Sequence, residues 1–264
     1  MRDLATLSSA DQRPKDAPTS VEVTDDAFLG GQVRVWQPAE GFRAGLDSVA
    51  LAASVTAISR QRVCDLGSGV GVASLCLAAR IPGLHFTAVE IDRDLAEIAT
   101  ANAARNSHAA SFDVVVADVL KRPRAIERQS FHHVITNPPF HDVERGTRAP
   151  APGKARATSA GSDELTAWLR FARALVRPKG WVTAILPPEQ LSLALQALLP
   201  SGTGVEIVPL WPKAGHAAKR IIVRARMNSN AGLRVLPGLV LHNADGTPTP
   251  EADAVLRHGK ALTT

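Results

Sequence analysis

Along the chain, short runs of apolar residues alternate with segments in which apolar residues recur every three or four positions. This pattern predicts strands that alternate with helices. Short apolar runs rich in β-branched residues predict strands at 62–66, 85–91, 112–117, 131–136, 181–186, 205–210 and 220–226. Apolar residues at helical spacing predict helices at 71–80, 93–106, 165–176 and 189–199, and Pro178-Lys179-Gly180 is expected to stop the third of them. Because alternating strands and helices build a parallel sheet covered on both faces, the pattern predicts a doubly wound α/β fold. The strands at 205–210 and 220–226 are expected to pair antiparallel. From Leu239 on, the sequence predicts a strand, a turn at 243–246 and a short helix that begins at Thr249-Pro250.

The beginning of the chain has a different composition from the rest. Residues 1–24 are polar and rich in Asp, Ser, Thr and Pro, which predicts a disordered tail. We expect residues 25–264 to form one domain, whose first part, 25–60, is a short N-terminal extension. In that extension, the alternating residues 33–36 predict a short strand, and Asp47 is placed to cap a helix over 48–53. The chain has 264 residues, of which 45% are hydrophobic, and this is enough for a packed core.

A strand–turn–helix segment at 63–71 carries Gly67 and Gly69, where a ligand can approach the backbone without meeting a Cβ atom. The spacing departs from the dinucleotide-binding pattern G-x-G-x-x-G/A, because Val72 stands where that pattern has a small residue. Asp65, before the first glycine, would repel a pyrophosphate and attract an amine-bearing ligand. This glycine loop therefore favours a nucleoside-type cofactor, with a plain structural turn as the alternative.

Two acidic residues end the next two strands along the chain. Glu90 stands where a carboxylate can accept hydrogen bonds from both ribose hydroxyls of an adenosine, whether the cofactor is NAD or S-adenosylmethionine. Asp118 can meet the amino group of the adenine. A solvated acid at Glu90 and a helix cap at Asp118 are the structural alternatives. Together with the glycine loop, these acids predict a site for an adenosine-bearing cofactor.

The most specific segment is the turn Asn137-Pro138-Pro139-Phe140, directly after an apolar strand. The lone pair of an exocyclic amine on a base is delocalised into the ring, so this nitrogen is a poor nucleophile. The side-chain oxygen of Asn137 and the carbonyl of Pro138 can accept both N–H groups and turn the lone pair towards a methyl carbon. Such contacts strengthen as positive charge grows on nitrogen in the transition state. Phe140 can stack on the base, which is worth about 1–3 kcal/mol.

These segments resemble a known class of enzymes. The glycine loop and the turn at 137–140 together resemble class I S-adenosylmethionine-dependent methyltransferases that modify exocyclic or amide nitrogens. The segments 26–31, 42–51 and 209–212 are similar to those of the bacterial tRNA(Val) adenine-N6 methyltransferase family. The resemblance implies a seven-stranded, mostly parallel sheet with an antiparallel last strand. It also implies that Asp47 lies against the cofactor.

The resemblance implies that the chain methylates N6 of an adenine in tRNA, at position 37 beside the anticodon. The family often has Tyr after the two prolines, whereas this chain has Phe140, and related enzymes with Phe there methylate guanine. A guanine-N2 rRNA methyltransferase and a glutamine-N5 protein methyltransferase are therefore alternatives. A catalytically silent module that binds RNA or a partner is the alternative outside enzymes. Asp65 and Val72 disfavour an NAD-dependent dehydrogenase.

The charge of the chain bears on its partner. A formal net charge of +5 and a pI near 9.7 are compatible with an anionic partner and equally with a slightly basic domain. The resemblance implies that the partner is RNA, in particular tRNA. Two basic segments, at 141–161 and 211–226, supply the candidate nucleic-acid contacts, which are Arg145, Arg148, Lys154, Arg156, Lys219 and Arg220. On a strand, Arg220, Arg224 and Arg226 would share one face. A solvated loop and an ordinary charged edge strand are the alternatives.

Several classes of protein are disfavoured by what the sequence lacks. No apolar run reaches 18 residues, and residues 1–20 lack the apolar core of a secretory signal, so we expect no membrane segment and a cytoplasmic location. Cys64 and Cys76 sit in apolar stretches, which predicts reduced, buried thiols. The eight histidines show no metal-ligand spacing, and we expect no metal.

Overall fold

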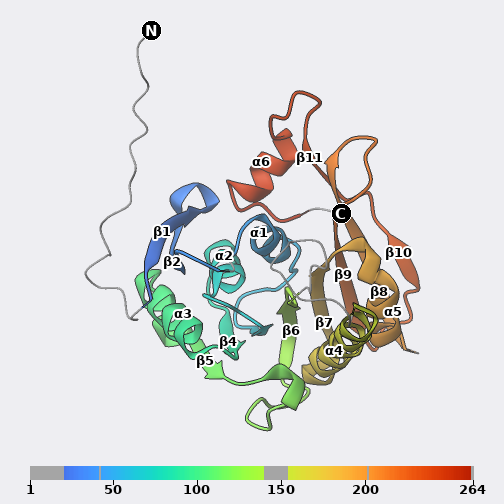
Figure 1. Cartoon of the computed structure of the whole chain (residues 1–264), viewed down its shortest axis with the longest axis horizontal. Coiled ribbons are helices and arrows are strands. Elements are labelled where there is room, and N and C mark those ends of the chain that lie inside the picture. Colours follow the sequence, from blue (N-terminus) through green and yellow to red (C-terminus); the bar gives the residue numbers. More distant parts are fainter. Residues whose placement is uncertain (1–20, 42, 140–153, 201, 263–264) are drawn as a thin grey trace.

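The computed structural model describes residues 21–41, 43–139, 154–200 and 202–262, with 154–161 described as backbone only. Within these residues the strands form a nine-stranded sheet and a separate two-stranded one (Figure 1). Helices lie on both faces of the large sheet, which confirms the doubly wound α/β architecture. No helix among the described residues is long and apolar enough to cross a membrane.

Seven strands form the continuous body of the large sheet in the order β5-β4-β3-β6-β7-β9-β8. Their bounds are β3 (Arg62–Leu66), β4 (His85–Glu90), β5 (Phe112–Val116), β6 (Phe131–Thr136), β7 (Val176–Leu186), β8 (Thr203–Lys213) and β9 (Arg220–Met227). The pairings from β5 to β7 are parallel, whereas β9 pairs antiparallel with both β7 and β8. The chain reverses its direction of travel across the sheet between β3 and β6, where open α/β sheets bind their ligands.

Two short strands extend the sheet beyond these seven, and the second is the strand that was expected from Leu239. β10 (Leu233–Val235) and β11 (Leu239–His242) both pair parallel with β8. β8 is 11 residues long, so its outer edge offers backbone groups to β10 near its start and to β11 near its end. A three-residue strand such as β10 is too short to show a period in the sequence.

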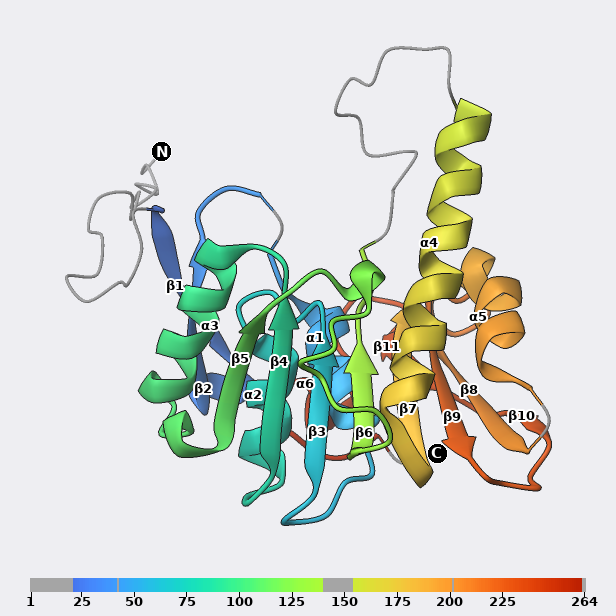
Figure 2. The same cartoon turned by 90° about the horizontal axis from the view of Figure 1, so that it is seen from below.

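The helices divide the interior into two apolar cores, one on each face of the sheet. α1 (Leu46–Ala53), α2 (Val72–Arg80), α3 (Arg93–Arg105) and α6 (Pro250–Leu256) pack into one core, and α4 (Lys154–Leu175) and α5 (Leu191–Leu198) into the other. The first part of α4 extends past the carboxyl ends of the parallel strands (Figure 2). Four 3-10 turns complete the described elements: η1 (Leu29–Gly31), η2 (Ala109–Ser111), η3 (Val119–Lys121) and η4 (Pro188–Gln190).

The N-terminal extension contains a hairpin that the sequence pattern showed only in part. The expected strand near residue 33 is β2 (Val33–Pro38), and it pairs antiparallel with β1 (Val23–Phe28). β1 starts inside the segment 1–24 that was expected to be a tail, and Val23 is buried, so that boundary was wrong by two residues. Residues 1–20 lie outside the described residues. Asn102 of α3 fixes β2, since its side chain accepts from the amide of Trp36 at 2.8 Å and donates to its carbonyl at 3.0 Å.

Two local expectations were wrong. Asp47 does not cap α1, because the helix starts two residues earlier than expected, with Gly45 at its N-cap and no side-chain cap. The Pro178-Lys179-Gly180 segment, which was expected to stop this helix, does not do so, because α4 ends at Leu175 and the segment lies inside β7, which begins at Val176 with an irregular register. At the far end of the chain the expected helix does form, with the Thr249 side chain accepting from the amide of Ala252 at 3.1 Å.

Candidate active site

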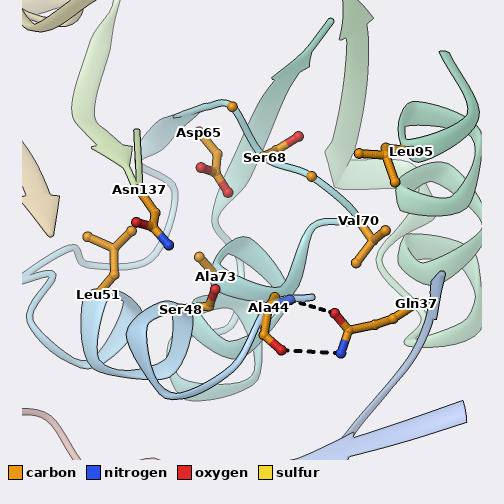
Figure 3. A pocket seen from close by; sticks show the side chains of 12 residues that line it. Gln37, Ala44, Ser48, Leu51, Asp65, Ser68, Val70, Ala73, Leu95 and Asn137 are labelled. Carbon is orange, nitrogen blue, oxygen red and sulfur yellow. Dashed lines mark hydrogen bonds between the residues drawn. The ribbon is translucent and has the colours of Figure 1, made fainter. Parts of the chain in front are cut away.

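A pocket opens where the carboxyl ends of β3 and β6 face α1 (Figure 3). It brings together four of the predicted site residues, Asp65, Gly67, Gly69 and Asn137, although they come from strands far apart in the sequence. The complete lining is Gln37, Ala44, Ser48, Leu51, Asp65, Gly67, Ser68, Gly69, Val70, Ala73, Leu95 and Asn137. The pocket therefore sits at the edge where the sheet order reverses, as expected for a ligand site in this kind of sheet.

The glycine loop wraps the end of β3 in a conformation that favours glycine. Gly67 has φ +69° and Gly69 has φ +55°, both in the left-handed region. The amides of Gly67 and Ser68 both donate to the carbonyl of Val89, at 2.8 and 3.0 Å. A Cβ atom on Gly67 would lie 3.0 Å from Cζ2 of Trp168, so this position has no room for a side chain either. The loop is thus a rigid wall of the pocket that exposes backbone.

Asp65 is a buried acid on the floor of the pocket. Only 2% of the residue is exposed, and its Oδ2 accepts a hydrogen bond from Ser74 Oγ at 2.7 Å. Burial raises the pKa of Asp65 to about 7, and the charge of Glu90 adds to this, while the Ser74 hydrogen bonds oppose it. A positively charged ligand would relieve the cost of burying the carboxylate. The site therefore fits an ammonium group, as predicted from the sequence.

Glu90 is buried and stabilises the glycine loop through hydrogen bonds to backbone amides. Its Oε2 accepts from the amide of Gly69 at 2.8 Å, and its Oε1 accepts from the amides of Ile91 and Asp92 at 2.8 and 3.0 Å. A carboxylate has about four lone-pair sites, so one remains for a further donor. The neighbouring Ile91 is 64% exposed and presents an apolar surface beside the loop. The contact of Glu90 with a ribose stays a prediction.

Besides Glu90, two of the predicted cofactor ligands lie outside the pocket lining, Asp118 and Asp47. Asp118 caps η3 by accepting from the amide of Leu120 at 2.9 Å, and it lies 3.7 Å from Lys121 Nζ. This is the helix-cap role that was the structural alternative for Asp118. Asp47 pairs with Arg220, whose Nε lies 2.8 Å from its Oδ2. Contacts of these two acids with the cofactor stay predictions.

Asn137 enters the pocket from the end of β6, and its environment is unusual. Its Oδ1 is buried and has no hydrogen-bond partner among the described residues. A buried acceptor without a donor is costly, so such an atom indicates a missing ligand or water. The preceding Thr136 fixes the strand end, because its Oγ1 donates to the carbonyl of Leu66 at 2.8 Å and accepts from Trp168 Nε1 at 3.0 Å.

The rest of the predicted amine-holding turn is described only in part. Pro138 is buried and Pro139 is exposed, while Phe140 lies outside the described residues. The stacking of Phe140 on a base therefore stays a prediction.

Gln37 is a pocket residue that the sequence analysis did not find. It is 2% exposed, its Oε1 accepts from the amide of Ala44 at 2.8 Å, and its Nε2 donates to the carbonyl of Ala44 at 3.3 Å (Figure 3). Nε2 also donates to Asp26 Oδ2 at 2.6 Å, and Arg43 pairs with the same oxygen. The available signal was that Gln37 falls on the buried face of β2, in step with Val33 and Val35.

The candidate nucleic-acid contacts are only partly within the described residues. Lys219 is exposed and Arg220 is tied to Asp47, and both stand where the antiparallel β9 begins, at the same edge of the sheet as the pocket. Lys154 and Arg156 belong to the start of α4, where only the backbone is described. Arg145 and Arg148 lie outside the described residues.

The expected basic face of β9 does not form as a surface. Arg224 is 5% exposed, its NH1 lies 3.3 Å from Glu206 Oε2, and burial is the main cause that lowers its pKa. β9 is also an inner strand between β7 and β8, so the alternative of a charged edge strand was wrong as well. A buried guanidinium that is partly paired cannot follow a phosphate backbone as an exposed one can.

Neither cysteine is among the residues that line the pocket. The part of the chain that the structure describes contains no group of three or more His, Cys, Asp or Glu residues that could hold a metal ion. Cys64 and Cys76 are free and buried, as predicted. Burial raises the pKa of the Cys76 thiol to about 12 and that of Cys64 well above its ordinary value.

Fold and pocket together define the class of this protein. The methyltransferase small domain family matches residues 44–150. The chain is similar to a predicted O-methyltransferase from Agrobacterium tumefaciens, with 27% identity and a TM-score of 0.68 over 82% of this chain and 98% of that one. It shares its fold with the 16S rRNA N2 G1207 methyltransferase of Thermus thermophilus, solved with AdoMet and guanosine (19% identity, TM-score 0.54, 78% of this chain and 50% of that one). The protein is a class I methyltransferase that uses S-adenosylmethionine.

The family follows from a relative with a clear sequence match. A tRNA1(Val) (adenine(37)-N6)-methyltransferase from Shewanella baltica is 32% identical over 184 residues, which cover 69% of this chain and 76% of the relative. The chain belongs to this family of methyltransferases, as the sequence resemblance indicated. The alternative of a catalytically silent binding module is thereby set aside.

Proposed function

We propose that the protein transfers a methyl group to N6 of an adenine in tRNA, at position 37 of tRNA1(Val). The observation that carries the proposal is the buried Oδ1 of Asn137, an acceptor without a donor in the pocket of a methyltransferase. An exocyclic amine supplies the donor that this atom lacks. The names of the family members supply the finer assignment to tRNA and to position 37.

In this proposal, S-adenosylmethionine supplies an electrophilic methyl group that is bonded to a positive sulfur. Asn137 Oδ1 and the Pro138 carbonyl accept the two N–H groups of the base and turn its lone pair towards the methyl carbon. An N–C bond forms while the S–C bond breaks, and the cationic amine then releases a proton to water. No strong base is needed, because the methylated amine is acidic before it loses this proton.

The remaining predicted residues bind and orient the two reactants. We assign the ammonium group of the cofactor to Asp65, since this buried carboxylate is stabilised by a positive partner. Glu90 is assigned to the ribose, with one lone-pair site left for it, and Asp118 to the adenine. Asp47 orders the start of α1 through its pair with Arg220. Gly67 and Gly69 give the cofactor access to the backbone.

The RNA contacts are assigned to the cations at the carboxyl edge of the sheet. Lys219 and Arg220 stand there, and α4, which carries Lys154 and Arg156, extends beyond the same edge (Figure 2). Arg145 and Arg148 precede α4 in the sequence. Contacts with phosphates make binding fall steeply with salt. An RNA acceptor therefore predicts activity that decreases as salt rises, which a protein acceptor does not require.

We also propose that residues 25–264 act as one domain in the cytoplasm, where tRNA is modified. The hairpin is tied to α3 through Asn102, and the C-terminal segment returns to α1, where the amide of Leu262 donates to the carbonyl of Ala53 at 2.9 Å. Both ends of the described chain thus support the pocket walls.

Incorporation of labelled methyl groups tests the proposal. The enzyme would be incubated with S-adenosylmethionine labelled in its methyl group and an unmodified tRNA1(Val) transcript, followed by nuclease digestion and identification of the nucleoside. We expect N6-methyladenosine, and none with a transcript that carries guanine at position 37. N2-methylguanosine as the product, or label only in glutamine of added protein, would establish one of the alternatives. An O-methylated product would follow the name of the Agrobacterium protein and contradict the role of Asn137.

A variant separates amine holding from cofactor binding. Asn137→Ala should bind S-adenosylmethionine with little change and lose turnover by roughly 100- to 1,000-fold, the usual effect of removing one group that stabilises developing charge. Asn230→Ala, at an exposed position outside the pocket, is the matched control. Near-normal turnover in Asn137→Ala would refute the amine-holding role.

A further inference from the structure

A second cavity lies at the opposite edge of the sheet from the cofactor pocket. It has a volume of about 270 Å³ and opens where β8 begins and β9 ends, beside β10. Its lining contains one aromatic residue, three charged residues and several small ones: Trp181, Gly204, Val205, Glu206, Arg226, Ser229, Ala231, Gly232 and Arg234. We call this cavity the amino-edge groove. No role in cofactor or amine binding has been given to it.

The pairing of the strands explains why polar groups gather on this part of the sheet. Trp181 is opposite Arg226, and Arg226 is opposite Gly204, so these positions share one face. Two residues further along each strand, on the same face, Arg224 is opposite Glu206, and Glu206 is opposite Arg234 on β10. Further on, the same face carries apolar side chains that belong to the core under α1 and α6. The groove is therefore the part of this face that the helices leave polar.

The charges of the groove do not balance. Glu206 lies 2.6 Å from NH2 of Arg234 and 3.3 Å from NH1 of Arg224, so one carboxylate is shared by two guanidinium groups. Arg226 is exposed and has no carboxylate partner among the described residues. The groove is lined by two arginines, Arg226 and Arg234, and by one carboxylate, Glu206, so it has a positive excess.

Trp181 holds the arginines in place. The guanidinium carbons of Arg224 and Arg226 lie over its ring, at 4.9 and 5.6 Å from the centroid. A guanidinium that is already ordered loses less side-chain entropy when it binds a ligand. Its planar fork matches the oxygens of a phosphate. The amino-edge groove therefore has the chemistry of a phosphate site.

We propose that the amino-edge groove binds a phosphate of the RNA backbone, as a second contact with the RNA acceptor that lies away from the site of methyl transfer. This inference rests on the proposed function. The groove is about 17 Å from the carboxyl edge, at roughly 3.3 Å per residue from Trp181 to the end of β7 at Leu186. A folded tRNA presents phosphates over more than this length, whereas a free phosphate would not need a groove open at the surface. Small residues at the rim, Ser229, Ala231 and Gly232, leave room for a chain to pass.

Charge reversal at the exposed arginine tests this proposal. Arg226→Glu should raise the KM for full-length tRNA about tenfold, leave kcat and the affinity for S-adenosylmethionine unchanged, and reduce the slope of log affinity against log salt by about 1. A short single-stranded oligonucleotide of the anticodon loop does not reach the groove, so its KM should not change. Lys260→Glu, an exposed cation outside the groove, is the matched control. The melting temperature of each variant checks that it is folded.

Each result decides the matter. An unchanged KM for full-length tRNA, or an equal loss with tRNA and the short oligonucleotide, overturns the proposal. If inorganic phosphate stabilises the wild type but not Arg226→Glu, and tRNA binding is the same for both, the groove is a site for a small anion and the RNA assignment is wrong. Direct tRNA binding, measured by fluorescence anisotropy, separates this inference from the proposed function. An Arg226-dependent salt slope without methylation would contradict only the proposed function.

Discussion

The ionisation of Asp65 makes cofactor binding depend on pH. Burial raises the pKa of this carboxyl to about 7, and the charge of Glu90 adds to the effect. The proposed partner is the ammonium group of S-adenosylmethionine, which pairs with the ionised carboxylate. Below pH 7 the cofactor therefore has to displace a proton from Asp65 before the pair can form. Binding should weaken as the pH falls.

The size of this effect follows from linkage. If the cofactor lowers the pKa of Asp65 to about 4 or below, the dissociation constant rises by about 25-fold from pH 7.5 to pH 5.5. This range stays below the pKa of a free α-amino group, about 7.7–8.0, so the ammonium keeps its charge.

The free protein shows the opposite trend in stability. The pKa of Asp65 is raised from 3.8 in the unfolded chain to about 7, so its stabilising contribution is complete below pH 4. That contribution is lost as the pH rises through 7, by roughly 4 kcal/mol at about 1.4 kcal/mol per pKa unit.

Isothermal titration calorimetry measures both the affinity and the proton. Titrations at pH 5.5, 6.5 and 7.5, in buffers of different ionisation enthalpy, should show release of up to one proton per cofactor. Asp65→Asn should bind more weakly at pH 7.5, lose most of the pH dependence and melt at a higher temperature than the wild type. Asp113→Asn, at an exposed position on β5, is the control. A wild-type affinity that is constant over this range, or a pH dependence that survives in Asp65→Asn, would refute the reasoning.

Three other variants follow from the geometry of the pocket and of α6. Gly67→Ala places a Cβ atom 3.0 Å from Trp168, and at φ +69° the left-handed backbone alone costs about 1–2 kcal/mol. Melting temperature and cofactor affinity should therefore both fall. The control is Gly246→Ala, at a left-handed position in open space, which should lose stability without loss of affinity. Gln37→Leu removes both hydrogen bonds to Ala44, at about 1 kcal/mol each, and calorimetry should show cofactor affinity lower by roughly tenfold or more; unchanged affinity would mean that the hairpin does not shape the pocket. Thr249→Ala removes the cap of α6 and should lower stability by about 1 kcal/mol in urea unfolding while leaving cofactor affinity intact.

Much of the large sheet was predictable from the sequence because its signals are local. The strands β3, β4 and β6 are short apolar runs whose side chains are mostly buried on both faces of the sheet. The glycine loop was predictable for a similar reason, since its left-handed backbone selects glycine at fixed spacing. The order of the strands came from the family resemblance, because the periods alone do not state which strands are neighbours.

The hairpin shows where local patterns fail. β1 has the sequence VTDDAF, whose two acids resemble a solvated tail. Its Asp25 is held by Arg34 and Arg105, and Arg105 is 80 residues away along the chain. Burial raises the pKa of Asp25. The hydrogen bonds and charges of the two arginines lower it by more, so that the pKa lies below its ordinary value. The segment is a strand because it pairs with β2 and because two arginines bind Asp25, and neither contact can be read from its own composition.

The sequence by itself determined that a parallel sheet would present Asp65, two glycines and Asn137 at strand ends, because strand periods and turn chemistry depend on neighbouring residues. Only the tertiary structure decided what each polar group meets there. It pairs Asp47 with Arg220, 173 positions apart, places Gln37 against Ala44, and buries Arg224 within the sheet. It also leaves Asn137 Oδ1 without a partner in the described pocket. Burial and charge pairing depend on distances in space, which no local pattern of residues contains.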